Sequence, residues 1–486
     1  MKNLPLIFLL LVFAPFAVSG QEYNVKGELR TPWKHSFGET QYILDTGKWD
    51  HKAIIDRIII EGNTVTRSSI IFREIGIHEG DRIDVDSIEF YKAQVKLRLL
   101  NLQLFNEVDQ TIAERKMGLS ICWTIKVKER WPVIPSVTVQ FADRNFNTWF
   151  VKQNHDLRRV SAGLTLTDKN FRGNLETLAV TVQGGYTQKL GISYMRPYVN
   201  KGQTNGAGFW FSVSQSRQAF FITDSNKLDY TGGYTGPVIL RQYEGGIGYI
   251  YRPGYASRNI FQLNYKDYSV GDTIIKLNPD YYTKGSTHAR FFELFYRYEY
   301  NGVDNWNYSL KGYKLVAIAI ARKGMEGLDF QSYANVEAGR YGKVAPCWYY
   351  SAIFRGRLIY PQDQPYYFRG GLGTQTDYVR GYEYFIIDGS HYGLVRLDIK
   401  RELFNHTWSF PLKYFTAIPL RIYPKIFADA GYINSPLPGN SFLSNRILYS
   451  YGAGIDVVTL YDVKIRLEFA RNQLNQNGLY LHFNSE

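Results

Sequence analysis

Val463-Lys464-Ile465-Arg466-Leu467-Glu468-Phe469 shows the period on which most of this chain is built. Apolar and charged residues alternate in it, and such residues point to opposite faces of a β-strand. The same period recurs over residues 177–183 and 395–400. These segments run to about 10 to 12 residues, near the length that a tilted strand needs to cross a bilayer. Strands of a soluble sandwich also alternate but are usually shorter, so the pattern favours a transmembrane β-barrel.

Segments of this kind number eleven before residue 378 and five after residue 382. The total of about sixteen is even, as single-chain bacterial barrels require. Their connections alternate in length, as periplasmic turns and outer loops do, although the turn 302–312 is longer than that rule predicts. The short connections are 169–174, 198–205 and 252–258, and the long ones are 218–236, 271–286 and 361–392. We therefore predict a mostly β fold with an antiparallel transmembrane barrel of about sixteen strands in residues 132–486.

The composition agrees with a barrel of this kind. Of the 486 residues 16% are aromatic, with 39 Tyr and 43 Gly, while the mean hydropathy is only −0.28. Barrel strands average to moderate hydropathy because their two faces differ, and they concentrate aromatic side chains at the membrane interfaces. The net charge of +13 is spread along the strands rather than clustered, which favours a basic lumen or rims that meet anionic lipid head groups over a nucleic-acid-binding surface.

The first 20 residues have the order of a secretory signal peptide. Lys2 precedes an apolar run from Leu4 to Val18, and Val18-Ser19-Gly20 provides small residues before an expected cleavage site. The run is too short for a transmembrane helix, and no cysteine follows it that would carry a lipid anchor. Residues 21–50 are polar and read as a linker or arm. Cys122 and Cys347 are too few for a disulfide framework and are either two free thiols or one bridge.

Residues 51–131 have a different pattern, that of a small α+β domain. A strand at 54–61 ends at Gly62-Asn63, and a short helix follows from Thr66, which we expect to cap it, through Glu74. A second helix is expected from Asp86, with Glu89 completing a capping box, and two strands follow it. The order β-α-α-β-β resembles a polypeptide-transport-associated (POTRA) domain. Its edge strand and the groove beside the second helix could bind extended peptide, or the domain could be a simple spacer.

Two motifs in the barrel region carry a more specific resemblance. Tyr378-Val379-Arg380-Gly381-Tyr382, preceded by Phe368-Arg369-Gly370-Gly371, falls in the sixth outer loop. Phe427-Ala428-Asp429-Ala430-Gly431 is a later strand whose alternation directs Asp429 into the lumen. Together with the POTRA-like domain, these motifs resemble the BamA-type superfamily of outer-membrane assembly and translocation barrels, also called bacterial surface antigen barrels.

The resemblance implies that the loop Val379–Tyr382 folds back into the barrel and that Arg380 fixes it to the wall. A guanidinium offers a planar fork of donors that suits a carboxylate, so Asp429 is the first candidate partner and Asp398 the second. Phe427 and Gly431 belong to the same strand motif. The alternative is an arginine that lies solvated in an outer loop.

The seam between the first and last barrel strands is a second candidate site. Pro132 and Pro135 lack the donor that a strand ladder uses, and the last expected strand, 478–484, is short. A weak seam could open and accept a client strand, although the prolines could equally mark a linker. Phe483 resembles the terminal aromatic residue that marks barrels for assembly.

Enzyme motifs are missing from the sequence, which has no His-Glu-x-x-His, no Gly-x-Ser-x-Gly and no phosphate-binding loop. We therefore expect no enzyme, no cofactor and no metal. The resemblance implies an integral protein of the bacterial outer membrane that assists the assembly, insertion or translocation of other proteins, with the POTRA-like domain in the periplasm. The alternatives are a dedicated secretion pore for specific clients and a non-transport lipid or surface barrel that retains the architecture.

The expected partners are outer-membrane lipids or lipopolysaccharide, unfolded outer-membrane or secreted polypeptides, and accessory periplasmic or lipoprotein subunits. We expect no nucleic acid. One departure bears on the task of the chain. Central assembly barrels carry several POTRA domains in series, and this sequence has room for one.

Overall fold

The computed structural model describes residues 52–116, 120–141, 155–232, 236–373, 377–409, 417–459 and 463–484. The predicted signal peptide, residues 1–20, and the predicted arm, residues 21–50, lie outside the described residues. Residues Lys48–Glu486 form one compact unit, which holds a small N-terminal domain and a closed β-barrel.

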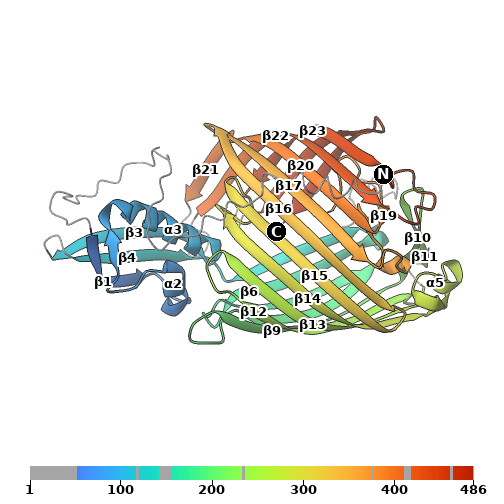
Figure 1. Cartoon of the computed structure of the whole chain (residues 1–486), viewed down its shortest axis with the longest axis horizontal. Coiled ribbons are helices and arrows are strands. Elements are labelled where there is room, and N and C mark those ends of the chain that lie inside the picture. Colours follow the sequence, from blue (N-terminus) through green and yellow to red (C-terminus); the bar gives the residue numbers. More distant parts are fainter. Residues whose placement is uncertain are drawn as a thin grey trace. The chain divides into compact units, whose positions relative to one another are not determined.

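The barrel is built of long antiparallel strands that run obliquely around it (Figure 1). In chain order they are β5 (Val133–Phe141), β6 (Val160–Phe171), β7 (Glu176–Gly185), β8 (Thr187–Arg196), β9 (Asn205–Ser216), β12 (Leu240–Tyr251), β13 (Ser257–Val270), β14 (His288–Val303), β15 (Gly312–Glu326), β16 (Phe330–Ala345), β17 (Trp348–Tyr360), β20 (His391–Arg401), β21 (Phe404–Ser409), β22 (Ala417–Asn434), β23 (Ile447–Val458), β24 (Lys464–Asn472) and β25 (Asn477–Asn484). The last strand, β25, lies beside the first, β5, and closes the ring.

The strand count agrees with the expectation from the sequence. Both β20 and β21 pair with β22, one after the other along its length, so they act as a single interrupted strand. Counted in this way, the described residues contain eleven barrel strands before the sixth outer loop and five after it. The predicted mostly β fold is therefore confirmed.

The two faces of each strand differ as the alternation predicts. On β24, Leu467 and Phe469 are exposed on the barrel exterior, whereas Lys464 and Glu468 are buried on the lumen side. Apolar side chains outside and charged side chains inside are the pattern of a barrel whose lumen is polar. Several of the described lumenal charges form ion pairs, among them Arg322 with Glu293 and Arg355 with Glu337.

The two ends of the barrel also differ. One end, here called the loop end, carries the connections 217–239, 271–287 and 361–390, and the other, here called the turn end, carries 172–175, 197–204 and 252–256. Figure 1 shows the hairpin β10 (Gln218–Asp224) and β11 (Lys227–Gly232), helix α5 (Asp272–Leu277) and β19 (Ile387–Gly389) together at the loop end. In the described residues three connections at that end are short: Tyr186 alone joins β7 to β8, residues 327–329 join β15 to β16, and residues 473–476 join β24 to β25.

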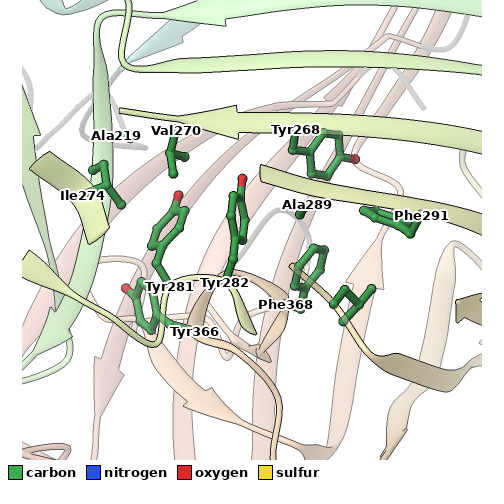
Figure 2. Packing of buried hydrophobic residues seen from close by; sticks show 11 residues of the cluster. Ala219, Tyr268, Val270, Ile274, Tyr281, Tyr282, Ala289, Phe291, Tyr366 and Phe368 are labelled. Atoms are coloured by element: carbon green, nitrogen blue, oxygen red, sulfur yellow. The ribbon is translucent and has the colours of Figure 1, made fainter. Parts of the chain in front are cut away.

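Three of the long loops pack together through aromatic side chains. Figure 2 shows Tyr281 and Tyr282 of the loop after α5 beside Tyr366 and Phe368 of the sixth outer loop. The ring of Phe220, on β10 in a third long loop, lies 6.4 Å from that of Tyr281. The ring centroids of Tyr282 and Phe368 are 5.9 Å apart. Because these rings come from loops far apart in sequence, their packing fixes the loops to one another at the loop end.

The N-terminal domain is a four-stranded sheet with two helices. Its strands β1 (Lys52–Glu61), β2 (Arg82–Asp84), β3 (Phe105–Lys116) and β4 (Ser120–Glu129) lie in the order β2-β1-β4-β3, and its helices are α2 (Ser68–Ile75) and α3 (Ile88–Asn101). Strands β1 and β4 are parallel neighbours in the centre of the sheet. Trp123 of β4, Ile71 of α2 and Leu99 of α3 are fully buried, so the helices and the sheet share one apolar core. The predicted β-α-α-β-β order is confirmed, with the short strand β2 added between the helices.

The predicted helix caps are wrong. Helix α2 starts after Arg67 without a side-chain cap, because the hydroxyl of Thr66 instead accepts a hydrogen bond from Asn170 of β6 (2.8 Å). Helix α3 begins at Ile88, after a 3-10 turn at Val85–Ser87 in which the side chain of Asp84 accepts the hydrogen bond from the Asp86 amide. At the start of both helices a residue type that favours capping is present, but a different hydrogen bond forms there in the folded chain.

Cys122 of β4 and Cys347, in the turn between β16 and β17, are free thiols. The structure therefore decides between the two alternatives that the sequence left open. In the part of the chain that the structure describes, no helix has the length and the apolar character needed to cross a membrane.

Candidate functional site

The sixth outer loop, residues 361–390, enters the barrel and brings Arg380 to the lumen wall. The Arg380 backbone amide and Nε donate to Oδ2 of Asp429 at 3.1 and 2.9 Å, and Nη2 donates to Oδ1 of the same carboxylate. Nη1 donates to Oδ1 of Asp398 at 2.6 Å and lies 3.3 Å from Oε1 of Glu468. The guanidinium also lies over the ring of Phe427, 3.9 Å from its centroid. The structure thus brings Arg380 together with both candidate carboxylates, and the solvated alternative does not apply because Arg380 is only 4% exposed.

The neighbouring residues of the loop explain why the approach is so close. Val379 packs against β22 at Gly431, where a Cβ atom would lie 2.8 Å from Cγ2 of Val379. Gly381 has φ +87°, a left-handed conformation that side chains rarely adopt, and its carbonyl accepts a hydrogen bond from Asn472 (2.8 Å). Tyr382 is buried and its hydroxyl donates to the carbonyl of Tyr449. Each residue of the motif therefore has a definite contact with the barrel wall.

The same loop also contacts the last barrel strand, which sequence reasoning missed. The ring of Tyr378 stacks on that of His482 of β25, with centroids 5.5 Å apart. The ring of Tyr384 packs against Tyr480, one inward position earlier on β25 (5.7 Å). The only sequence signal is the alternation of Tyr480 and His482 on one face of the final strand. Because β25 lies at the seam, the loop is in contact with both the wall and the seam.

The charges around Arg380 continue toward the turn end. Glu468 pairs with Nζ of Lys425 (2.6 Å), and Lys425 pairs in turn with Asp456 (2.6 Å). Asp456 also accepts a hydrogen bond from the hydroxyl of Tyr308 (3.0 Å). A continuous series of ion pairs and hydrogen bonds therefore joins Arg380 to Tyr308. Burial of these groups without their partners would be costly, so the cluster holds together as a unit.

Tyr308 belongs to the turn that is longer than the alternation of connections predicts. Its ring packs against Tyr423 (5.0 Å between centroids), beside Val458, and is 3% exposed. Nζ of Lys400 lies 4.8 Å from the centroid of the same ring. The extra length of the turn, residues 304–311, is used to fold inward, so that Tyr308 reaches lumen-facing residues of β22 and β23.

The motif Phe368-Arg369-Gly370-Gly371 does not join the Arg380 cluster. Arg369 donates to Asp280, in the loop after α5, and to the carbonyl of Gln364. Gly370 and Gly371 form the short strand β18 (Gly370–Leu372), which pairs with β19. A Cβ atom at Gly371 would lie 2.4 Å from the carbonyl oxygen of Ile387, so this hairpin requires glycine there.

The predicted seam residues lie where the sequence placed them. Pro135 is inside β5 and opposes Leu166 of β6, and Pro132 lies just before the strand. Phe483 is in β25 and opposes Ile465 of β24. Strands β5 and β25 contain 9 and 8 residues, and β24 beside β25 also contains 9, whereas β14 and β16 contain 16 each. The seam is therefore formed by two short strands.

The N-terminal domain contacts the turn end through a buried ion pair. Nη1 and Nη2 of Arg252, in the turn between β12 and β13, donate to the carboxylate of Glu74 of α2, which is 1% exposed. Arg73 donates to the carbonyl of Gln203 in the neighbouring turn (2.8 Å). Among the described residues there is no cluster of His, Cys, Asp and Glu suited to a metal ion. The site is thus a set of ion pairs that fix a loop, a turn and a domain to the barrel.

Comparison with known proteins agrees with these observations. Residues 53–130 match the POTRA family model, described as "Surface antigen variable number repeat". No curated protein sequence matches the chain. Solved structures with a similar fold include CdiB from Escherichia coli, with a TM-score of 0.54, 12% identity, and 89% of this chain and 75% of that chain covered.

CdiB from Acinetobacter baumannii is similar as well, with a TM-score of 0.50, 14% identity, and 89% and 73% of the two chains covered. BamA from Haemophilus ducreyi lacking POTRA domains 1-3 aligns with a TM-score of 0.49 at 13% identity over 89% and 83% of the two chains. At these identities the two CdiB structures support the fold and nothing beyond it. Residues 53–130 are thus a POTRA domain, and the chain, in which this domain is followed by a closed β-barrel, shares the fold of the two CdiB structures.

Proposed function

We propose that the protein is an integral barrel of the bacterial outer membrane that assists the assembly, insertion or translocation of other outer-membrane or surface proteins. The observation that carries the proposal is the position of the sixth outer loop. Arg380 fixes this loop to β20, β22 and β24, while Tyr378 and Tyr384 contact β25 at the seam. A change in the loop would therefore act directly on the strand that closes the barrel.

The two faces of the barrel support the membrane location. Its exterior carries large apolar side chains, and its lumen carries paired charges, which is the arrangement that a bilayer outside and water inside would select. With the POTRA domain in the periplasm, the turn end faces the periplasm and the loop end faces outward. We place the domain boundary between residues 131 and 132, just before β5.

The seam supports the proposed action on client polypeptides. Strand β25 has only eight residues, and Pro135 of β5 cannot donate a hydrogen bond to a neighbouring strand. A client strand could pair with either edge if β5 and β25 separated, because an exposed strand edge offers unpaired backbone donors and acceptors. In this proposal the Arg380 cluster keeps β25 in place until a client arrives.

The POTRA domain offers a second place for extended polypeptide. Strand β3 is at the edge of the domain sheet, and Phe90 of α3 is 58% exposed beside it in the domain. Clients reaching the barrel from the periplasm could add a strand at β3 before they pass to the seam. Outer-membrane lipids, lipopolysaccharide, and accessory periplasmic or lipoprotein subunits are the other partners that we propose.

Depletion of the protein in its own bacterium tests the proposal. We expect many unrelated outer-membrane barrels to fall in abundance, as measured by quantitative proteomics of the outer membrane. Wild-type protein supplied from a plasmid should restore them, and the Arg380→Ala variant should not. Arg369→Ala is the matched control, because this arginine of the same loop pairs with Asp280 outside the cluster. If depletion leaves all other envelope proteins unchanged, the proposal is refuted.

A second candidate is a secretion pore for particular clients. The observation in its favour is that the described residues contain a single POTRA domain, whereas several in series are typical of central assembly barrels. In that case, depletion would remove one exported protein and leave the other barrels at their normal abundance. The same proteomic measurement therefore distinguishes the two functions.

A further inference from the structure

The exterior of the barrel has a hollow over β15 and β16, where the outward-facing side chains are small. They are Ala317, Ala319 and Ala321 on β15 and Ser332 and Ala334 on β16. Their outward direction follows from the residue that alternates with them, since Arg322 binds the buried Glu293 inside the barrel (2.6 Å). Most other outward positions on neighbouring strands carry large apolar side chains, so these five residues leave a depression.

Strand register places walls on both sides of the depression. On β14, Leu294 lies opposite Ala321 and Tyr296 lies opposite Ala319. On the other side, Tyr360 and Leu358 of β17 lie opposite Ser332 and Ala334. Leu294 and Tyr360 are 62% and 70% exposed, so both project outward from the barrel surface. The depression belongs to a wider hollow of about 1080 Å³, lined mostly by apolar atoms, that also reaches Tyr249 of β12 and Leu263 of β13.

The hollow has the dimensions of a lipid chain. Neighbouring strands are about 4.8 Å apart, so the two walls, three strand intervals from each other, are separated by roughly 14 Å at the backbone. Along β15 the distance from residue 317 to residue 323 is about 20 Å at 3.4 Å per residue. That is somewhat more than one leaflet of a hydrocarbon core about 30 Å thick. An extended acyl chain would fit lengthwise, with one end toward the loop end of the barrel.

Lys323 is an outward-facing cation at that end. Lys323 is the next outward-facing residue of β15 beyond Ala321, it is exposed, and it lies between Phe292 of β14 and Phe330 of β16. In the described parts of the chain it has neither an ion-pair nor a hydrogen-bond partner. Its neighbour Arg290, in contrast, lies within ion-pair distance of Asp267 and Glu326. An unpaired ammonium flanked by aromatic rings is suited to an anionic group held at the membrane surface.

We propose that this hollow binds one acyl chain of a membrane lipid with an anionic phosphate head group, and that the phosphate pairs with Lys323. The inference rests on the proposed outer-membrane location, which directs the loop end outward. The lipid then belongs to the outer leaflet. Its binding site lies on the exterior of β14–β17, away from the seam between β5 and β25. A protein partner would need a surface that matches the hollow, and its binding is an outcome of the test below.

Native mass spectrometry of the purified, folded full-length barrel in detergent tests the site, with lipid A as the probe. Wild-type protein is expected to retain one lipid A molecule at concentrations that leave the control lipid diacylglycerol unbound. In the variant Ala319→Phe with Ala334→Phe, two rings would occupy the hollow, and retention should be lost. Lys323→Gln should weaken retention about fivefold, the effect of one surface cation on an anionic lipid. Ala453→Phe, an outward-facing alanine on β23, is the matched control and should behave as wild type.

Equal lipid A retention by the filled variant and by wild type would overturn the proposal. So would a filled variant that changes only the proportion of dimer in the spectrum, because the occupant would then be a second copy of the chain. Equal retention by the Lys323→Gln variant would refute the phosphate contact. These readouts come from purified protein, so they fail or succeed independently of the depletion experiment, which tests the proposed function.

Discussion

Removal of the Asp429 carboxylate tests how the sixth outer loop is fixed. Asp429 accepts three hydrogen bonds from Arg380, from its backbone amide, Nε and Nη2, and its side chain is fully buried. Asp398 accepts one hydrogen bond from Arg380, from Nη1, and another from the hydroxyl of Ser351 (2.7 Å). If these contacts fix the loop, Asp429→Ala must weaken the barrel more than Asp398→Ala does.

The loss in the free energy of unfolding of each variant follows from the contacts that the substitution removes. Breaking a buried ion pair by removing one partner costs about 3 to 5 kcal/mol, since the other charge is left uncompensated. Asp429→Ala should approach that value, because only Asp398 and Glu468 then remain near Arg380. Asp398→Ala should cost about 1.5 to 3 kcal/mol, the range for one hydrogen bond between charged groups. Asp429→Asn keeps one acceptor oxygen but no charge, and its cost should fall between the two.

The assay is the urea dependence of the folded barrel in detergent micelles, followed by its faster migration on unheated gels. Asp280→Ala is the control, since this carboxylate is 62% exposed and its pair with Arg369 should contribute no more than about 1 kcal/mol. Equal midpoints for the Asp429 and Asp398 variants would show that Asp429 is not the main anchor. A midpoint for Asp429→Ala no lower than that of Asp280→Ala would refute the anchoring altogether.

Three further changes have defined outcomes. Gly431→Ala should displace Val379, since its Cβ would lie 2.8 Å from Cγ2 of that residue, and should cost about 1 to 3 kcal/mol in the same urea assay. Tyr308→Phe should cost about 1.5 to 3 kcal/mol through the lost hydrogen bond to the Asp456 carboxylate, and Tyr308→Ala clearly more; equal midpoints for the two variants would contradict the packing of the ring. Burial alone would raise the pKa of Glu129, but hydrogen bonds from residues 64–66 outweigh it and lower the pKa. The stabilisation of the POTRA domain by this carboxylate should therefore be present above about pH 4.3, the unfolded-state value, and be lost as the pH falls through the lower folded-state pKa. Protease cleavage within residues 62–67 should increase over that range in wild type, and Glu129→Gln should remove this pH dependence.

The strand content and the inner and outer faces of the barrel could be predicted from the sequence because they are local. Alternation with a period of two residues indicates which side chains share one face of a strand, and this does not depend on the neighbouring strand. Leu467 and Glu468, adjacent in sequence, lie outside and inside the barrel in the structure. The predicted helix caps were wrong; Thr66, for example, has another partner in Asn170, about a hundred residues away in sequence.

The candidate site could be predicted only in part, because its contacts join residues that are far apart in sequence. Arg380 and Asp429 stand in recognisable motifs, but nothing local relates Tyr378 to His482 or Tyr308 to Asp456. Those contacts depend on how far the loop enters the lumen and on the inward fold of a turn. The sequence alone indicated that the turn 302–312 is longer than the alternation of connections predicts, but it did not indicate that this turn folds inward.

What the sequence by itself determined is the kind of element and its two faces, because each strand carries its own alternating pattern. What only the tertiary structure decided is which residues on different strands become neighbours. The hollow over β15 and β16 depends on Ala319 lying opposite Ala334, between Tyr296 and Leu358, and that follows from register rather than from any one strand. Register depends on turn geometry and on the match between the faces of two paired strands, so no single strand contains it.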